Sequence, residues 1–190
     1  TTVVTLTPLL VMTLVDYRLT RQAFESEATM GTARMVSTTW RSLSFLLSQR
    51  RAALEFIAHD NSLDDLLAPG RLDAILANLQ SGMGGFADLG VVDANCTMQA
   101  YAGPHGFQKQ PMKAACFDNT VTRSFLIGDV TMTQNRNHQL IIAIRHELNN
   151  GDFFVLQAAL NAALLDGPIS QLNLDPMDDA FIVNTGGILQ

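Results

Sequence analysis

The sequence predicts an α+β fold in which a long N-terminal helix precedes an antiparallel sheet. Residues 19–59 contain no proline, and their apolar side chains recur at three- and four-residue spacings, which is typical of an amphipathic helix. Phe86 to Pro104 reads as an apolar strand, a turn at Ala94-Asn95 and a second strand. Three further strand-like runs follow, so we expect five antiparallel strands after the helices.

The first fifteen residues carry no charge, which fits the end of a transmembrane helix or the core of a signal peptide. The run leads into Asp16-Tyr17-Arg18 and not into the small residues of a cleavage site. We therefore expect residues 1–15 to be the end of a transmembrane helix that anchors the chain in a membrane. The alternative is a buried N-terminal helix of a soluble domain, which the lack of amphipathic spacing disfavours.

Residues 16–59 are expected to form a stalk. A helix of about 40 residues is about 60 Å long, so it can pack on a small domain along only part of its length. Its apolar stripe is longer than one such domain can cover, and we expect the stalk to mediate a homodimer.

Two shorter helices are predicted before the sheet. Asn61-Ser62 with Asp64-Asp65 resembles a helix start, Pro69-Gly70 ends that helix, and Arg71 to Gln80 restarts one. The glycines that follow lack the Gly-Lys-Ser/Thr ending of a phosphate loop and precede a strand. They are expected to form a flexible joint between helix and strand.

The later strands are expected in the runs Ser124 to Thr133, Gln139 to Arg145 and Asp152 to Leu160. Ala162 to Leu172, interrupted by Gly167-Pro168, reads as a helical connector. Ala180 to Gln190 repeats the strand-turn-strand pattern, which suggests a second unit of the same fold. The predicted boundaries are 60–161 for the first unit, 162–174 for the connector and 175–190 for the start of the second.

Composition excludes several classes of function. The chain is 47% hydrophobic with a net charge of −6, and no basic patch with interleaved aromatic residues indicates nucleic-acid binding. The four histidines are scattered, no cofactor motif or metal-ligand spacing is present, and the acidic pairs lie at element starts. We expect no catalytic residues in this span and no bound cofactor. Cys96 and Cys116 could form one bridge or remain two buried thiols.

These features resemble the periplasmic Cache sensor region of bacterial transmembrane receptors, and sensor histidine kinases most of all. The resemblance covers almost the whole chain, and five segments carry it: the apolar start that runs into a long helix, SFLLSQRRAALEFIAHDNSLDDLL, GGFADLGVVDANCTMQAYAGP, SFLIGDV and DAFIVNTGGILQ. It implies two PAS-like units outside the inner membrane, a small ligand in the membrane-distal unit and a cytoplasmic output module. Chemoreceptors and cyclases share the same sensor region, so the resemblance leaves them as alternatives to the histidine kinase.

The sequence departs from the family's amino-acid-binding members, which are similar to one another in an Arg, a following Trp-Tyr pair and a later Asp. At the matching position this chain has Ala114-Ala115-Cys116-Phe117, while Asp129 matches the later Asp. An α-amino acid is therefore not the implied ligand, and the alternatives are a pocket that binds another molecule or one that no longer binds any.

A candidate ligand site is expected on the sheet face that the segment His105 to Asn119 would cover. An aromatic rim with a few convergent charges suits a small carboxylate or another polar organic molecule. The candidate residues are Tyr101, Phe117, Arg123, Phe125, Asp129 and Arg145. The competing functions are a ligand-free dimerisation or protein-interaction module and a soluble enzyme.

Overall fold

The computed structural model describes residues 12, 33–104, 124–132, 138–149, 151–170, 180–184 and 187. The chain divides into two compact units, Thr1–Ser42 and Leu43–Gln190. In the first unit the described residues from 33 onward are helical. Everything described below belongs to the second unit, which contains the sheet.

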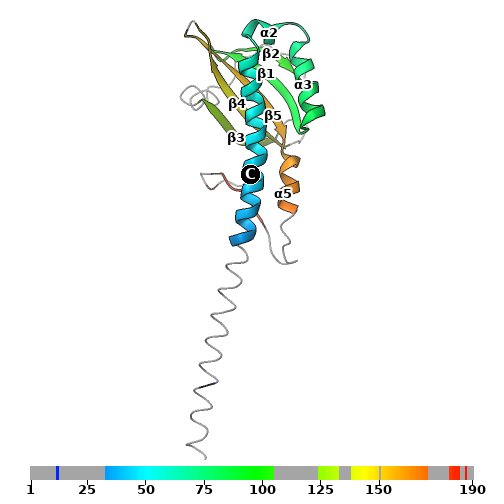
Figure 1. Cartoon of the computed structure of the whole chain (residues 1–190), viewed down its shortest axis with the longest axis vertical. Helices are drawn as coiled ribbons and strands as arrows, with labels where there is room; N and C mark the ends of the chain where they lie inside the picture. The colour runs from blue at the N-terminus through cyan, green and yellow to red at the C-terminus, as the bar shows by residue number, and fades with distance from the viewer. Residues whose placement is uncertain are drawn as a thin grey trace, which may run out of the picture. The chain divides into compact units, whose positions relative to one another are not determined.

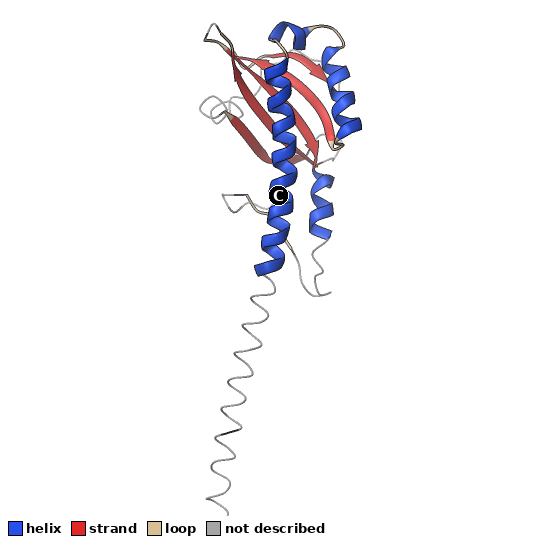
Figure 2. Cartoon of the chain, viewed as in Figure 1, coloured by secondary structure: helices blue, strands red, loops and turns tan. Residues whose placement is uncertain are grey.

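Helical residues continue to position 60, which confirms the long predicted helix over its described part. In the second unit this helix lies across the sheet beside α3 (Arg71–Gly82), as Figures 1 and 2 show. Leu54 and Ala58 are fully buried, whereas Phe45 and Phe56 are more than 60% exposed. The helix therefore has one face in the core and an outer face that carries aromatic side chains.

A capping box starts α2 (Leu63–Leu67) at the predicted serine. The Ser62 hydroxyl accepts from the Asp65 amide, and the Asp65 carboxylate accepts from the Ser62 amide at 3.2 Å. These bonds to Ser62 hold the pKa of Asp65 below its ordinary value. The first turn that the sequence predicts is thus confirmed.

The five predicted strands are all present as one antiparallel sheet in the order β2-β1-β5-β4-β3. The strands are β1 (Phe86–Asp93), β2 (Met98–Ala102), β3 (Phe125–Met132), β4 (His138–Glu147) and β5 (Phe153–Asn161). The last strand in sequence, β5, lies in the middle of the sheet. β5 pairs with β1 and with β4 in a nearly regular register, and this register determines which side chains lie on the same face of the sheet.

The joint between α3 and β1 needs glycine. Gly84 and Gly85 have φ values of 65° and 79°, in the left-handed region. A Cβ on Gly85 would also lie 2.9 Å from the Leu164 side chain. The glycine cluster therefore makes a close helix-to-strand turn. Backbone conformation and packing explain these glycines without a phosphate ligand.

The described part of the connector is helical, as predicted, but the helix is not interrupted at Gly167-Pro168. The 3-10 helix η2 (Ala162–Leu165) leads directly into α5 (Asp166–Ser170), which contains Gly167 and Pro168. The helix was expected to be interrupted at this pair. The first turn of a helix tolerates proline because its missing amide hydrogen would have no partner there.

Several predicted segments lie outside the described residues. They are residues 1–15 apart from Met12, the cover at 105–119, Cys116, and most of 171–190. Among the described residues of this segment, the Asn184 carbonyl accepts from the Gly187 amide at 2.9 Å. No helix among the described residues is long and apolar enough to cross a membrane.

Candidate functional site

The two faces of the sheet carry different kinds of side chain. The face under the long helix, α2 and α3 is lined by large apolar residues, and we call it the helix-covered face. Its fully buried members are Leu89, Val91, Ile142, Phe154, Leu156, Ala158 and Leu160. We call the other side the opposite face, defined by Asp88, Gly90, Val92, Met98, Tyr101, Leu126, Ala143, Arg145, Phe153, Val155 and Gln157.

A row of paired residues crosses the middle of the opposite face. Tyr101 pairs with Gly90, Gly90 with Gln157, and Gln157 with Ala143. Because Gly90 has no side chain, those of Met98 and Gln157 come close to the position its Cβ would occupy, at 3.2–3.3 Å. The Gln157 amide forms no hydrogen bond with any described residue, so both its donor and acceptor groups are available to a bound molecule.

An apolar floor lies beside this row. Val92, Ala143 and Val155 form a small buried cluster of their own, separate from the main core. Half-buried Cys96, Leu126 and Phe153 pack against it. These side chains form the packed apolar floor of the opposite face.

Asp88 and Tyr101 make one polar corner of the face. The Asp88 carboxylate accepts from the Tyr101 hydroxyl at 3.3 Å and from the Ala159 amide at 3.2 Å. The bulge between Phe86 and Asp88 in the β1–β5 ladder brings the carboxylate to that amide. Gly103 permits the corner, because a Cβ there would lie 2.5 Å from the Tyr101 hydroxyl.

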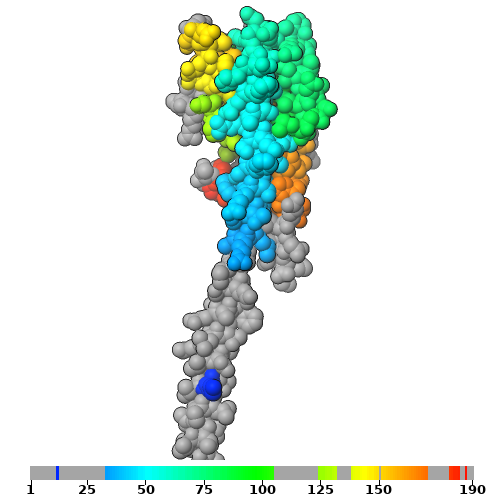
Figure 3. Space-filling model, viewed as in Figure 1, coloured from blue at the N-terminus to red at the C-terminus, as the bar shows by residue number. Residues whose placement is uncertain are grey.

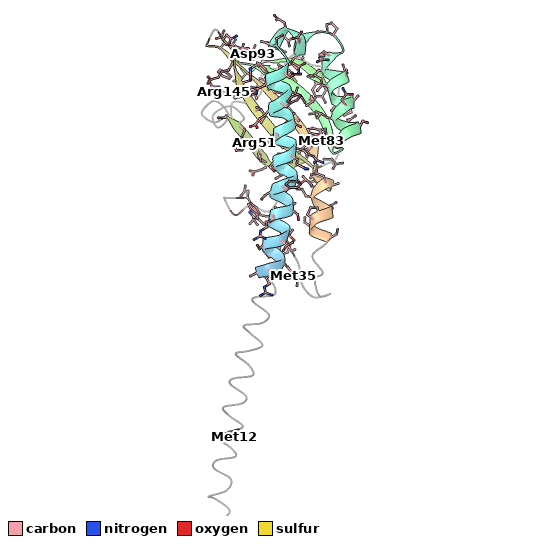
Figure 4. The ribbon with its side chains drawn as sticks, in the orientation of Figure 1. Met12, Met35, Arg51, Met83, Asp93 and Arg145 are labelled. Carbon is pink, nitrogen blue, oxygen red and sulfur yellow. The ribbon has the colours of Figure 1, made fainter. Side chains whose placement is uncertain are left out.

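Arg145 makes the other polar corner. Its guanidinium lies 4.4 Å from the Phe153 ring centroid and 3.2 Å from the Glu147 carboxylate, and its side chain is 24% exposed. Arg145 is labelled in Figure 4. β2 and β4, which contain Tyr101 and Arg145, are three strand spacings or about 14 Å apart, and Arg145 also lies two residues along β4 from the row that contains Tyr101. In the strand order, Gln157 on β5 lies between the two corners.

The turn at the end of β1 is fixed by Asp93, which Figure 4 labels. Its carboxylate accepts from the amides of Asn95 and Thr97 at 2.8 and 2.9 Å, and from the Gln99 side chain. This Asx-type turn places Cys96 at a φ of 61° and against the apolar floor.

Phe125 does not share a face with Tyr101 and Arg145. It pairs with Ile144, packs against the main core and lies 3.5 Å under the Arg51 guanidinium of the long helix. Its expected place at the rim of the site is therefore corrected: the register turns it toward the helix. Arg51 is held in turn by Glu55 at 2.8 Å.

Asp129 already has a protein partner. It lies where the β3–β4 register shifts between Ile127 and Val130, and its carboxylate accepts from the Asn184 amide group at 2.9 Å. The structure thus connects Asp129 to the segment at 180–184 and not to the corners at Tyr101 and Arg145.

Of the remaining predicted site residues, Phe117 and Arg123 lie outside the described residues. Sequence reasoning missed Asp88 and Gln157. Both are polar residues within otherwise apolar strands, and each lies next to a buried leucine. A polar residue in such a strand indicates the face that points away from the core, and this pattern could have identified them. No group of three or more His, Cys, Asp or Glu in the described ranges could hold a metal ion.

Comparison with known proteins supports the fold. No family model matches the sequence, and no curated protein sequence matches it. Among solved structures, the chain resembles the extracellular domain of vpHK1S-Z8, which is classed as a histidine kinase, with a TM-score of 0.58 and 15% identity. This match covers 75% of the chain and 59% of that domain.

Two chemoreceptor domains are similarly close. The ligand-binding domain of the Pseudomonas aeruginosa PAO1 amino acid chemoreceptor PctC, in complex with GABA, matches with a TM-score of 0.63 and 15% identity over 80% of this chain and 69% of that one. The isoleucine-bound sensory domain of Campylobacter jejuni Tlp3 matches with a TM-score of 0.59 and 9% identity over 82% of this chain and 66% of that one.

The chain has the Cache-like sensor fold. The fold that the sequence predicts, a long helix on a PAS-like antiparallel sheet, is thereby confirmed. At 9–15% identity the likeness concerns the fold alone. The chain spans 59–69% of the length of these domains.

Proposed function

We propose that this chain is the extracytoplasmic ligand-sensing region of a bacterial inner-membrane receptor. The observation that carries the proposal is the division of the sheet into a helix-covered face and an opposite face with an apolar floor and two polar corners. Solved sensor domains of a histidine kinase and of chemoreceptors share the fold. The sequence resemblance favours a two-component histidine kinase, and a chemoreceptor is the second candidate because its sensor domains match equally well.

The proposed ligand is a small carboxylate or similarly polar organic molecule on the opposite face. Arg145 would hold a carboxylate, Gln157 would donate to or accept from a central polar group, and Tyr101 would close the far corner. PctC in complex with GABA and Tlp3 with isoleucine bound are neighbours whose ligands carry a carboxylate. Phe117 and Arg123 remain proposed contributors from the covering segment.

A thermal-shift screen tests ligand binding. A molecule that binds only the folded state at about 100 times its Kd stabilises it by about 2.7 kcal/mol, which raises the Tm of a chain of this size by roughly 5–10 °C. GABA should be compared with butyrate and with butylamine, which each keep one of its two charged groups. Shifts from carboxylates but not from butylamine support the proposal. No shift across organic acids, amines and sugars would favour a protein-interaction module instead.

We also propose that the long helix forms a homodimer through its outer face. Phe45 and Phe56 are 64% and 68% exposed, and the residues between them on that face, Gln49 and Ala52, are uncharged and exposed. Eleven residues separate the two aromatic side chains, which is about three helical turns, so both lie on one stripe. A parallel copy would bring each phenylalanine against its counterpart.

Sedimentation of residues 16–190 tests the dimer. Phe56→Glu should convert a dimer to a monomer, because it places two like charges opposite each other in the interface. Ser44→Glu is the matched control, since Ser44 is also exposed but lies on another side of the helix. A wild-type chain that stays monomeric at high concentration contradicts this proposal and leaves the ligand proposal standing.

The predicted division of the chain is likewise proposed, with residues 60–161 as the membrane-distal unit and 175–190 as the start of a second. This division is supported by the comparison with solved sensor domains, because the chain covers only 59% and 66% of the length of two of them.

A further inference from the structure

Two histidines from different elements meet where the long helix ends. His59 lies in the last turn of the helix and His146 near the end of β4, and their rings are edge to face with centroids 4.7 Å apart. The His146 ring also packs on Phe154 of β5 at 5.2 Å. Phe154 is fully buried, so the pair joins the helix end directly to the core of the sheet.

Among the described residues, no carboxylate forms an ion pair with either histidine ring. His59 Nδ1 is 2.9 Å from the Glu55 carbonyl oxygen, while the Glu55 carboxylate is held by Arg51. Arg145 and Glu147 flank His146 on β4 and pair with each other. The remaining nearby acidic groups are Asp60 on the helix and Asp152 beside β5, and neither forms an ion pair with either ring.

Protonation therefore acts against this contact. Burial and the positive charge on His59 lower the pKa of His146 below its ordinary value of 6.5. An edge-to-face ring pair is favourable when both rings are neutral, and two imidazolium rings at this distance repel each other. The contact is thus stable at neutral pH and unfavourable in acid.

We propose that the His59–His146 contact is a pH-sensitive latch, which holds the end of the long helix against β4 and β5 at neutral pH and releases it in acid. The sign follows from proton binding. The folded chain binds protons at His146 less readily than the unfolded chain, so the stabilising effect is present above about pH 6.5 and is lost as the pH falls through the lowered pKa. The latch is independent of the ligand site, which lies on the other face of the sheet.

Hydrogen exchange of the whole chain tests the latch. Peptides from residues 52–61 report the helix end, and peptides from residues 72–82 of α3 are an internal reference. Between about pH 7.5 and pH 5.5, after correction for the intrinsic exchange rate, the helix end should lose protection several-fold more than α3. Equal loss in both regions, or no loss, would overturn the proposal.

His146→Phe should remove the pH response, because phenylalanine keeps the aromatic contact with Phe154 and cannot be protonated. His138→Gln removes a histidine from the exposed start of the same strand and should leave the response unchanged. If His146→Phe does not fold, His59→Gln serves in its place, since His59 is exposed. A full response in either latch variant, or an equal reduction in His138→Gln, contradicts the latch.

Discussion

The two faces of one sheet differ in what their side chains can do. The helix-covered face presents large, fully buried side chains such as Leu156 and Phe154, and the long helix closes it (Figure 3). The opposite face presents Gly90, Ala143 and Gln157 at neighbouring positions of the same strands. Alternation along each strand thus places neighbouring residues on different faces, one in the main core and the other on the proposed ligand face.

The largest expected effect separates two adjacent residues of β5. Leu156→Ala should lower the free energy of unfolding by about 2–5 kcal/mol, because it leaves a cavity beneath the helix. Gln157→Ala, one position along, should lower it by about 1 kcal/mol or less, since its side chain is half-buried and forms no hydrogen bond with described residues. Urea denaturation of both variants measures the difference. Similar losses would show that the two faces are not divided in this way.

A smaller effect is expected at Gly103, which keeps the polar corner of the opposite face close-packed. Gly103→Ala would place a Cβ 2.6 Å from the Asp88 Cβ and closer still to the Tyr101 hydroxyl, so the two side chains must separate. Overpacking of this kind costs about 1–3 kcal/mol. Thermal unfolding measures it, and Gly82→Ala is the control because a Cβ there meets nothing within 4 Å. A Gly103→Ala variant as stable as Gly82→Ala would mean that the corner is loosely packed.

The smallest effect concerns the contact between the long helix and the edge strand. Arg51→Ala should cost about 1 kcal/mol, because it removes the cation–π contact with Phe125 and the pair with Glu55. Glu55→Gln removes only the exposed ion pair and should cost about 0.5 kcal/mol or less. Chemical denaturation distinguishes them. If Glu55→Gln costs as much as Arg51→Ala, the ring contact contributes nothing measurable.

The sequence was sufficient to predict the helices and strands, but not the face of the sheet on which each side chain lies. Runs of β-branched residues bounded by turns predicted all five strands, and Ser62 with Asp65 predicted a helix start that the capping box confirms. The sequence places Phe125 beside Tyr101, whereas the structure puts the two residues on different faces. The face of a strand residue depends on its pairing register, which a single sequence does not give. The pairing that starts at Tyr101 runs across the sheet to Leu126 without a shift, so the neighbouring Phe125 lies on the helix-covered face.

The site was harder to predict for the same reason. Asp88 and Gln157 share a face only because β5, the last strand in sequence, pairs with β1. Asp129 resembled a binding residue by its position in the family pattern, whereas its partner Asn184 lies 55 residues away. Contacts between distant segments decide these roles, and a single sequence does not contain them.

The most direct test is the affinity of a molecule found in the thermal-shift screen for matched variants of the two faces. Isothermal titration should show that Arg145→Ala and Gln157→Ala weaken binding at least about tenfold, which corresponds to about 1.4 kcal/mol. Phe125→Leu and Asp129→Asn should bind as the wild type does, with circular dichroism confirming that each variant is folded. Unchanged affinity in Arg145→Ala and Gln157→Ala, together with loss in Phe125→Leu or Asp129→Asn, would contradict the assignment of the opposite face as the ligand site.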